Sequence, residues 1–382
     1  MAKGKKKVVN EDEASEQPES TNMLLSLRDR LAKAAKGVHV SVMSDSKIAE
    51  RNEFVETPSY DLNRILSGDL RKGLPKRTWT CFVAPEHAGK SSFMALIAAE
   101  ARLKYNSQVI IIDTEGGWDK NFIKRWGLNP EEVLYIYTPW IDEIKVILAN
   151  ILAGKEENLI IVLDSIGGIE KKKIQEDALK GEPKADQGTL QKELKPLYKL
   201  LSNIVKTKDC IALNSAHYYG NPSGYGDADI VGGGKYLKLA VDIVVAIKKS
   251  KMLDKDKNVI GNKLTATTMK NRMYPPFNEA TVEIDFQNGI NKYAGLLEIA
   301  EEAEVIMHDG NTYSYVDDTG KEYKGVGEAQ AYSKLFSVHG EQIVNKINEY
   351  VKTTGFSTLN VELQNAIQAA EDSIAATDIT DI

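Results

Sequence analysis

One short segment carries the residue types and the spacing of a phosphate-binding loop. It reads Ala84-Pro85-Glu86-His87-Ala88-Gly89-Lys90-Ser91 and departs from the pattern G-x-x-x-x-G-K-[ST] only at its first residue. In such a loop the backbone N–H groups converge on a triphosphate, the lysine neutralises the outer phosphates and the hydroxyl ligates Mg²⁺. Alanine resists the positive φ that glycine accepts freely, so the loop must begin in a conformation that Ala84 tolerates.

The flanking sequence suits this chemistry. Residues 77–83 are apolar and partly β-branched, which predicts a strand, and residues 92–100 predict a helix. A strand–loop–helix unit directs the helix N-terminus and its partial positive charge at the phosphates. The alternative is a glycine turn followed by an incidental lysine.

Two carboxylates follow other apolar runs. Asp164 ends the run 159–163 and precedes Ser165, which is a Walker B arrangement for supporting Mg²⁺. Asp113 and Glu115 end the run 108–113, and Glu115 could polarise the attacking water. The alternatives are a turn-capping aspartate at 164 and a solvated loop carboxylate at 115.

Two segments have the composition of a nucleic-acid contact. Residues 218–234 are rich in glycine and carry Tyr218, Tyr219 and Tyr225, whose rings could pack against exposed bases. The stretch from Glu170 to Lys184 includes the basic run Lys171, Lys172 and Lys173. The alternatives are a mobile surface loop and a solvated face.

The order of elements predicts the fold class. Strands are expected at 77–83, 108–113, 133–137, 159–163 and 210–214, and helical stretches separate them. Their continuously apolar runs indicate burial on both faces, which is typical of an α/β fold with a mostly parallel, doubly wound sheet. Runs at 241–247, 264–270 and 281–286 predict additional, antiparallel strands, and Ile343, Val344, Ile347 and Val351 mark a late helix.

Composition limits the protein class. The chain has 382 residues, a net charge of −6, no apolar run of membrane-spanning length and no signal core after its basic N-terminus. We therefore expect a cytoplasmic protein with Cys81 and Cys210 as buried thiols. The net charge argues against a uniformly basic nucleic-acid binder but allows a local DNA-binding groove.

Composition and periodicity along the chain predict five regions. Residues 1–22 are expected to form a disordered tail, and 23–52 a docking helix and linker, with Leu24, Leu27, Leu31 and Ala35 at helical spacing and Gly37 as its C-cap. Residues 53–297 would form the core, 298–355 a small C-terminal α/β domain, and 356–382 an acidic tail. The helix could dock on its own domain or on a neighbouring subunit.

Several motifs, in order and spacing, resemble the RecA family of strand-exchange recombinases, and within it the phage UvsX type. They are the phosphate loop, the segments 58–67 and 73–75, Ile112–Glu115, Asp164-Ser165, Gly232-Gly233-Gly234, Met269–Phe277 and Asn288–Tyr293. Glu176–Leu179 and Gly295–Glu298 lean toward the phage version. The likeness covers residues 53 to about 330.

The resemblance implies an ATPase with a RecA-like core that forms a helical filament on single-stranded DNA and pairs it with a homologous duplex. ATP and Mg²⁺ would lie between protomers, with Ala84–Ser91 and Ser92 around the phosphates. Lys270 and Arg272 would reach the neighbour's γ-phosphate. Asp119 and Phe122 would hold the adenine, and Tyr293 would approach it from the next subunit. Lysines 171–173, Tyr218, Tyr219, Tyr225 and Gly232–Gly234 would lie in the DNA-binding loops.

The chain departs from the family pattern after Asn214. The family often carries glutamine or histidine there to sense the γ-phosphate, whereas this chain has Ser215, with His217 two residues on. Asn214, Ser215 and His217 are therefore the candidate sensors. Three other functions are compatible with a phosphate loop: a ring-shaped helicase or motor, a regulatory ATP-binding assembly protein, and a small-molecule kinase. The kinase would need an arginine-rich lid, and the sequence after the core contains none. Single-strand-binding and mediator proteins are further expected partners.

Overall fold

The computed structural model describes residues 19–35, 39–46, 52–181, 189–220 and 229–354. The chain divides between residues 51 and 52 into two compact units. The first contains helix α1 (Glu19–Ala34) and the short 3₁₀ helix η1 (Met43–Asp45). Because α1 begins at Glu19, the predicted tail of residues 1–22 is too long. Gly37 and the tail 356–382 lie outside the described residues.

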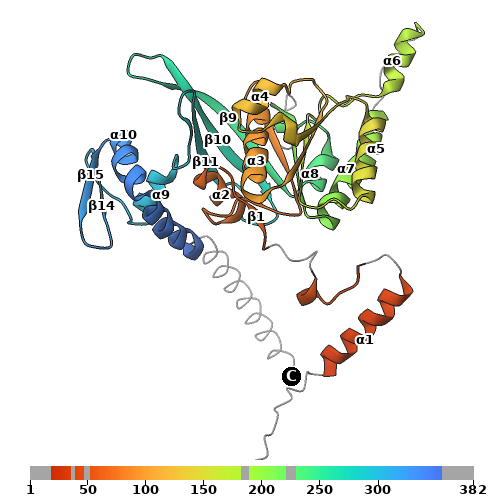
Figure 1. Cartoon of the computed structure of the whole chain (residues 1–382), viewed down its shortest axis with the longest axis horizontal. Coiled ribbons are helices and arrows are strands. Elements are labelled where there is room, and N and C mark those ends of the chain that lie inside the picture. The colour runs from red at the N-terminus through yellow and green to blue at the C-terminus, as the bar shows by residue number, and fades with distance from the viewer. Residues whose placement is uncertain (1–18, 36–38, 47–51, 182–188, 221–228, 355–382) are drawn as a thin grey trace, which may run out of the picture. The chain divides into compact units, whose positions relative to one another are not determined.

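Within the described residues, the second unit is built on a mixed sheet of ten strands. Its parallel part runs, in spatial order, through β9 (Ile243–Leu253), β3 (Thr78–Ala84), β7 (Cys210–Gly220), β6 (Leu159–Asp164), β4 (Gln108–Asp113) and β5 (Val133–Tyr137). On the β9 side the sheet continues antiparallel through β10 (Val259–Asn271), β11 (Glu279–Asp285) and β12 (Gly289–Asn291). The predicted α/β class with a mostly parallel core is confirmed, and β9 and β10 extend past the sheet as a long hairpin (Figure 1).

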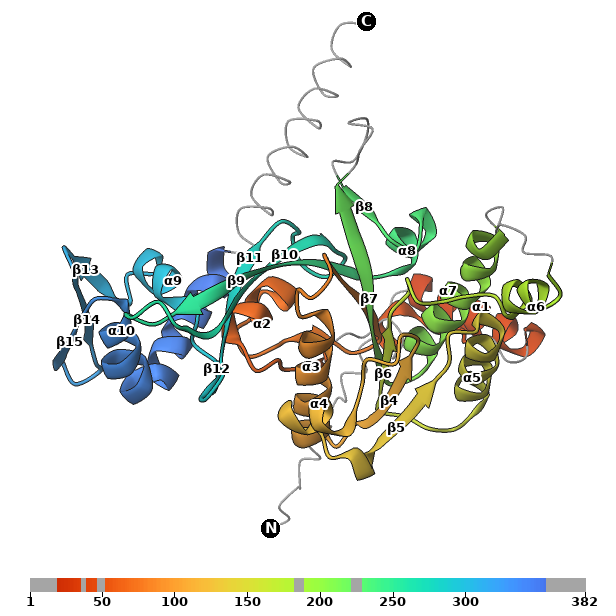
Figure 2. The same cartoon turned by 90° about the horizontal axis from the view of Figure 1, so that it is seen from above.

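Helices cover both faces of this sheet, as can be followed in Figure 2. One face packs against α2 (Tyr60–Ser67), α3 (Lys90–Tyr105) and α4 (Lys120–Arg125), and the other against α5 (Ile141–Ala153), α7 (Thr189–Thr207) and α8 (Lys235–Ala240). Strand residues alternate between the two cores: in β3, Phe82 joins the first, and Cys81 and Val83 join the second. Burial on both faces explains the uninterrupted apolar runs. Cys81 and Cys210 are buried free thiols, as predicted.

Two predicted loops contain regular structure. Strand β7 continues to Gly220 and pairs with β8 (Asp229–Val231), so the ends of the segment 218–234 form an antiparallel ladder. Tyrosine and valine favour strands, and here they pair across the hairpin at Tyr218 and Val231. The segment around 168–190 likewise contains a two-turn helix, α6 (Lys172–Leu179).

The C-terminal part packs onto the core through a third hydrophobic cluster. It comprises α9 (Leu296–Glu302), a sheet of β13 (Met307–Asp309), β14 (Thr312–Val316) and β15 (Glu322–Val326), then α10 (Glu328–Gln330), the π-helical turn η3 (Ala331–Phe336) and helical residues 337–354. The predicted late helix is present, and Ile343, Val344, Ile347 and Val351 are buried in the cluster with Tyr60 and Leu70 of the core. Helix α9 crosses the boundary drawn at 297, so that division stays a proposal.

Two small elements complete the unit: the ladder of β1 (Phe54–Val55) with β2 (Leu74–Pro75), and the 3₁₀ helix η2 (Pro130–Glu132) before β5. Among the described residues, no helix has both the length and the apolar character that crossing a bilayer requires.

Candidate nucleotide-binding site

The phosphate loop begins in a strand. Ala84 is the last residue of β3, is fully buried and pairs with His217 of β7. It therefore has the extended backbone that any residue adopts, and alanine is tolerated there. The positive φ values fall later, at His87 (55°) and at Gly89 (91°), which caps α3. Glycine's conformational freedom is needed at the end of this loop rather than at its start.

Lys90 is the first residue of α3, and its side chain folds back over the loop. Its Nζ donates hydrogen bonds to the carbonyl oxygens of Ala84 (3.1 Å) and Pro85 (2.9 Å). Burial lowers the pKa of Lys90, and the nearby carboxylates of Asp164 and Glu115 oppose this shift. An ammonium held by neutral carbonyls in a buried site is well placed to bind an anion instead.

Asp164 ends β6 and receives three hydrogen bonds. Its Oδ2 accepts from the hydroxyl of Ser91 at 2.6 Å and from the indole Nε1 of Trp118 at 2.7 Å, and its Oδ1 accepts from the hydroxyl of Ser215. Burial raises the pKa of Asp164, and these three donors oppose the rise. Hydroxyl and carboxylate oxygens are the ligands that Mg²⁺ prefers, so Ser91 and Asp164 fit this ion.

Glu115 lies on the loop after β4, beside the same pocket. Its carboxylate accepts a hydrogen bond from the hydroxyl of Ser165, the residue that follows Asp164. Asp113 has a different position: its carboxylate accepts from the backbone N–H groups of Glu115, Gly116 and Trp118, at 2.8 to 3.0 Å. Asp113 therefore shapes the loop that carries Glu115, and only Glu115 reaches the pocket.

These side chains surround one cavity of about 680 Å³, a size suited to a nucleotide. It is lined by the phosphate loop from Glu86 to Ser92 and by Glu115, Gly117, Phe122, Asp164, Ser165, Ser215, His217 and Lys249. The structure thus brings together most of the residues predicted to hold phosphates, Mg²⁺ and the attacking water. Phe122 packs edge-on against Trp118, with ring centroids 5.1 Å apart.

The side chain of Asn214 points into the protein core and not into the pocket. Its side chain is fully buried, accepts a hydrogen bond from the indole of Trp79 at 2.7 Å and donates to the sulfur of Cys81. Of the three candidate sensors, only Ser215 and His217 line the pocket. Asp119 caps the N-terminus of α4 by accepting from the backbone N–H of Asn121 and Phe122.

Three residues expected to act across a subunit boundary are also absent from the lining of this chain's own pocket. Nζ of Lys270 donates to the carbonyls of Lys238 and Val241, both at 2.6 Å. Arg272 bonds Asp242 (3.3 Å) and the carbonyl of Leu239 (2.8 Å). Tyr293 packs between Tyr60 and Phe336, with ring centroids 5.7 and 5.4 Å away.

The residues expected to contact DNA lie in two places. Lys171 and Lys172 come just before and at the start of α6, where they pair with Glu193 (3.6 Å) and Glu143 (3.5 Å). Gly232 donates its N–H to the carbonyl of His217 at 2.8 Å, and Gly233 and Gly234 have φ of 93° and 80°. A Cβ on Gly233 would lie 2.8 Å from Ile166, so this turn requires glycine. Tyr225 and the side chain of Tyr219 lie outside the described residues.

Sequence reasoning missed several residues of the site, among them Trp118 and Lys249. Trp118 follows the Glu-Gly-Gly turn, and Lys249 comes from β9, where it donates to the carbonyl of His87 at 2.9 Å. Nothing in the spacing of either residue marks it, because each meets the site only through the pairing of distant segments.

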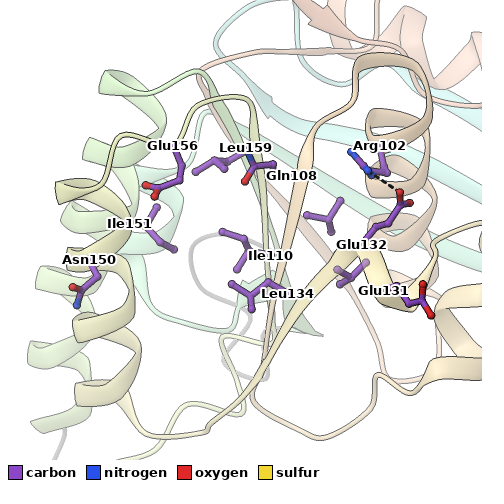
Figure 3. Close-up of a pocket in the computed structure, with 12 residues that line it drawn as sticks. Arg102, Gln108, Ile110, Glu131, Glu132, Leu134, Asn150, Ile151, Glu156 and Leu159 are labelled. Carbon is purple, nitrogen blue, oxygen red and sulfur yellow. Dashed lines mark hydrogen bonds and ion pairs between the residues drawn. The ribbon is translucent and has the colours of Figure 1, made fainter.

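A second cavity, of about 610 Å³, lies at the β5 edge of the sheet (Figure 3). Aliphatic side chains of Ile110, Leu134 and Ile151 face it, and the ion pair between Arg102 and Glu132, at 2.8 Å, stands at its rim. None of its lining residues belongs to the nucleotide pocket. This edge groove is therefore a separate surface.

Comparison with known proteins agrees with this geometry. The family model described as the RecA N-terminal domain matches residues 29–291. The "Recombination and repair protein" of Enterobacteria phage T4 is 25% identical over 290 residues, which cover 75% of this chain and 73% of that protein. "Protein RecA" of Oceanobacillus iheyensis is 27% identical over 73% of this chain and 78% of its own length. "Protein RecA" of Leptospira meyeri is 26% identical over 88% and 83%. Since the family match spans most of the sequence, the chain belongs to the RecA family of recombinases.

Proposed function

We propose that this protein is a DNA-dependent ATPase that forms a helical filament on single-stranded DNA and promotes homologous pairing and strand exchange. The observation that carries the proposal is the convergence of Lys90, Ser91, Glu115 and Asp164 on one nucleotide-sized pocket. Two hydrogen bonds tie this group together, from Ser91 to Asp164 and from Ser165 to Glu115.

Each of these side chains has a role in ATP hydrolysis. Lys90 would exchange its two carbonyl partners for phosphate oxygens, and Ser91 and Asp164 would hold Mg²⁺. The bound ion supplies neutralisation of the charge that develops on the outer phosphates. Glu115, oriented by the Ser165 hydroxyl, would align the attacking water and accept its proton on a carboxylate oxygen.

The positions of Lys270 and Arg272 support a seam between protomers. Neither cation lines the pocket of its own chain, and both rest on the segment 238–242, largely on backbone carbonyls. Cations in this state could serve a neighbour's γ-phosphate in the manner of an arginine finger supplied in trans. In the same scheme Tyr293 would face the neighbour's adenine, with Asp119 and Phe122 on the chain that holds the nucleotide.

The edge groove at β5 is a second surface that could contact a neighbouring protomer. β5 is the terminal strand of the sheet, and Leu134 and Tyr137 on it are each 59% exposed. Edge strands with exposed apolar side chains readily accept a further strand. The N-terminal unit of a neighbouring copy offers Val40 and Val42, at the alternate spacing of a strand, and exposed leucines on α1. We propose that this segment covers the groove in the filament.

The backbone offers a route from nucleotide to DNA. β7 carries Ser215, bonded to Asp164, then His217, whose carbonyl holds Gly232 at the base of the β7–β8 hairpin. A shift of Ser215 or His217 on γ-phosphate binding would move this hairpin, so we assign γ-phosphate sensing to these two residues. The hairpin and the region of α6 would contact single-stranded DNA, and homologous duplex, single-strand-binding proteins and mediators would be the further partners.

Phosphate release and filament imaging test this proposal together. We expect ATP turnover to rise severalfold with single-stranded DNA, and electron microscopy with a slowly hydrolysed ATP analogue to show helical filaments. Closed rings would favour the motor function instead. Tight ATP binding with negligible phosphate release would favour the regulatory one. A chain that remains a single particle with both ligands in excess would contradict the proposal.

A further inference from the structure

Lys249 joins the nucleotide pocket from an unexpected element. It lies on β9 opposite Leu264 of β10, and its ammonium donates a 2.9 Å hydrogen bond to the carbonyl oxygen of His87. Among the described residues, the pocket is lined by three carboxylates, Glu86, Glu115 and Asp164, and by two ammonium groups, Lys90 and Lys249. Lys90 binds phosphate in the proposed site, whereas Lys249 has no role in it so far.

His87 is the strained residue of the phosphate loop. Its φ of 55° lies in the left-handed region, which is costly for a residue with a Cβ and free for glycine. An external contact to this residue offsets part of that cost. The bond from Lys249 acts on the carbonyl of the same residue.

The direction of this bond fixes the next peptide unit. In a trans peptide the C=O of one residue and the N–H of the next point in opposite directions. Since the carbonyl of His87 is turned toward the Lys249 ammonium, the N–H of Ala88 points away from it. In a phosphate loop such N–H groups form the anion cradle, and a rotated peptide would present a carbonyl oxygen to the phosphates instead.

We propose that Lys249 is a positioning residue of the nucleotide site: by holding the His87 carbonyl toward β9, it keeps the Ala88 N–H directed at the phosphates. This inference rests on the proposed ATP site. It assigns to a strand of the chain's own sheet the task of stabilising the phosphate loop in its anion-binding form. Because Lys249 acts through the loop, the affinities for ADP and for ATP should depend on it equally. The rate of the chemical step should not depend on it.

Binding measurements on the full chain test this. Affinities for Mg²⁺–ADP and for a slowly hydrolysed Mg²⁺–ATP analogue would be measured by calorimetry. We expect Lys249→Gln to weaken both by a factor of about five to ten, as for loss of one charge-assisted hydrogen bond at a partly exposed site. Turnover at saturating ATP and single-stranded DNA should stay within about twofold of wild type, so that the change appears in KM.

Two variants separate positioning from general charge. Lys249→Arg retains a donor that reaches the same carbonyl, and should restore affinity to within about twofold of wild type. Lys251→Gln removes the same charge two residues farther along the same face of β9, at an exposed residue outside the pocket lining, and should leave both affinities unchanged. The thermal unfolding midpoint without nucleotide checks that each variant is folded, and Lys249→Met replaces the glutamine variant if that one is not.

The outcomes discriminate between the two levels of the proposal. If wild-type protein binds neither nucleotide, the proposed function itself fails. If wild type binds and Lys249→Gln binds equally well, only the positioning role is overturned. A loss confined to the ATP analogue would also overturn it, because it would indicate direct contact with the γ-phosphate, and so would an equal loss in Lys251→Gln or no recovery in Lys249→Arg.

Discussion

The indole Nε1 of Trp118 and the carboxylate of Asp164 are joined by a buried 2.7 Å hydrogen bond. The same carboxylate oxygen accepts a hydrogen bond from Ser91. Trp118, on the loop after β4, therefore helps to orient the carboxylate of the proposed metal site. Partners that orient a metal ligand commonly matter nearly as much as the ligand itself. Trp118 is therefore a residue of the site although it carries no reactive group.

Replacing Trp118 by phenylalanine removes this donor and keeps an aromatic ring at the same place. We expect the pKa of Asp164 to rise further and the apparent affinity for Mg²⁺ in ATP hydrolysis to fall about tenfold. Mg²⁺ titration of the ATPase rate provides the measurement. Trp126→Phe is the matched control, because the Trp126 Nε1 is buried and has no hydrogen-bond partner within the described structure. Equal effects in the two variants would show that the loss is one of packing.

Asp164 should lower the stability of the nucleotide-free fold at neutral pH, although Mg²⁺ binding needs its carboxylate. Burial raises its pKa above the ordinary value, so the folded chain retains a proton that the unfolded chain releases. Stability therefore falls as pH rises from the ordinary aspartate pKa through the raised pKa of the folded state. Asp164→Asn removes that slope and abolishes Mg²⁺-dependent hydrolysis, and the thermal midpoint of the nucleotide-free protein should rise at neutral pH.

A pH series of unfolding midpoints checks this sign. Asp242→Asn provides the contrast, because Asp242 is fully buried and paired with Lys206 at 2.8 Å and Arg272 at 3.3 Å. Removing its charge weakens the hydrogen bonds to both cations and should destabilise the fold by about 1–3 kcal/mol. A midpoint for Asp164→Asn that still falls with the wild-type pH slope would rule out Asp164 as the source of that slope.

Mixing inactive protomers tests the seam. Lys90→Ala should lose ATP turnover by about 100-fold or more, since it removes the phosphate-binding ammonium. Arg272→Ala should lose a comparable factor if its guanidinium acts on the neighbour's nucleotide. In an equal mixture, about one quarter of the seams then combine an intact loop with an intact arginine, and about one quarter of wild-type turnover should return. Lys248→Ala is the control for loss of a surface cation, because Lys248 lies on the opposite face of β9 from Lys249. Its ATP turnover should equal that of wild type when it replaces wild-type protein in a mixture with either inactive variant. No recovery on mixing would place Arg272 outside the neighbour's site.

The β5 edge should be needed for assembly and not for nucleotide binding. Leu134→Glu puts a charge into the edge groove at a position that is 59% exposed, so the fold should tolerate it. We expect filament length on single-stranded DNA to collapse while ADP affinity stays within about twofold of wild type. Leu103→Glu on α3, at a leucine 81% exposed, is the control and should still form filaments. Normal filaments from Leu134→Glu would show that the groove lies outside the interface.

Local patterns predicted the parts of the site that depend on local geometry. β4 and β5 have the bounds that their apolar runs predicted, and the loop, Glu115 and Asp164 follow strands as expected. Parallel strands bring their carboxyl ends to one edge, so residues at those ends meet whatever the intervening sequence. The β7–β8 hairpin and α6 were harder to predict, since short elements owe their stability to packing more than to propensity.

The amino-acid sequence alone determined the family, the α/β class and the residues that could hold phosphate and Mg²⁺, because these depend on residue type and short-range order. Tertiary structure decided that Trp118 supports Asp164, that Lys249 holds His87, that Asn214 faces the interior, and that Lys270 and Arg272 lie away from their own pocket. Each of these relationships joins segments far apart in the chain, and only the pairing and twist of a common sheet set their distances and directions.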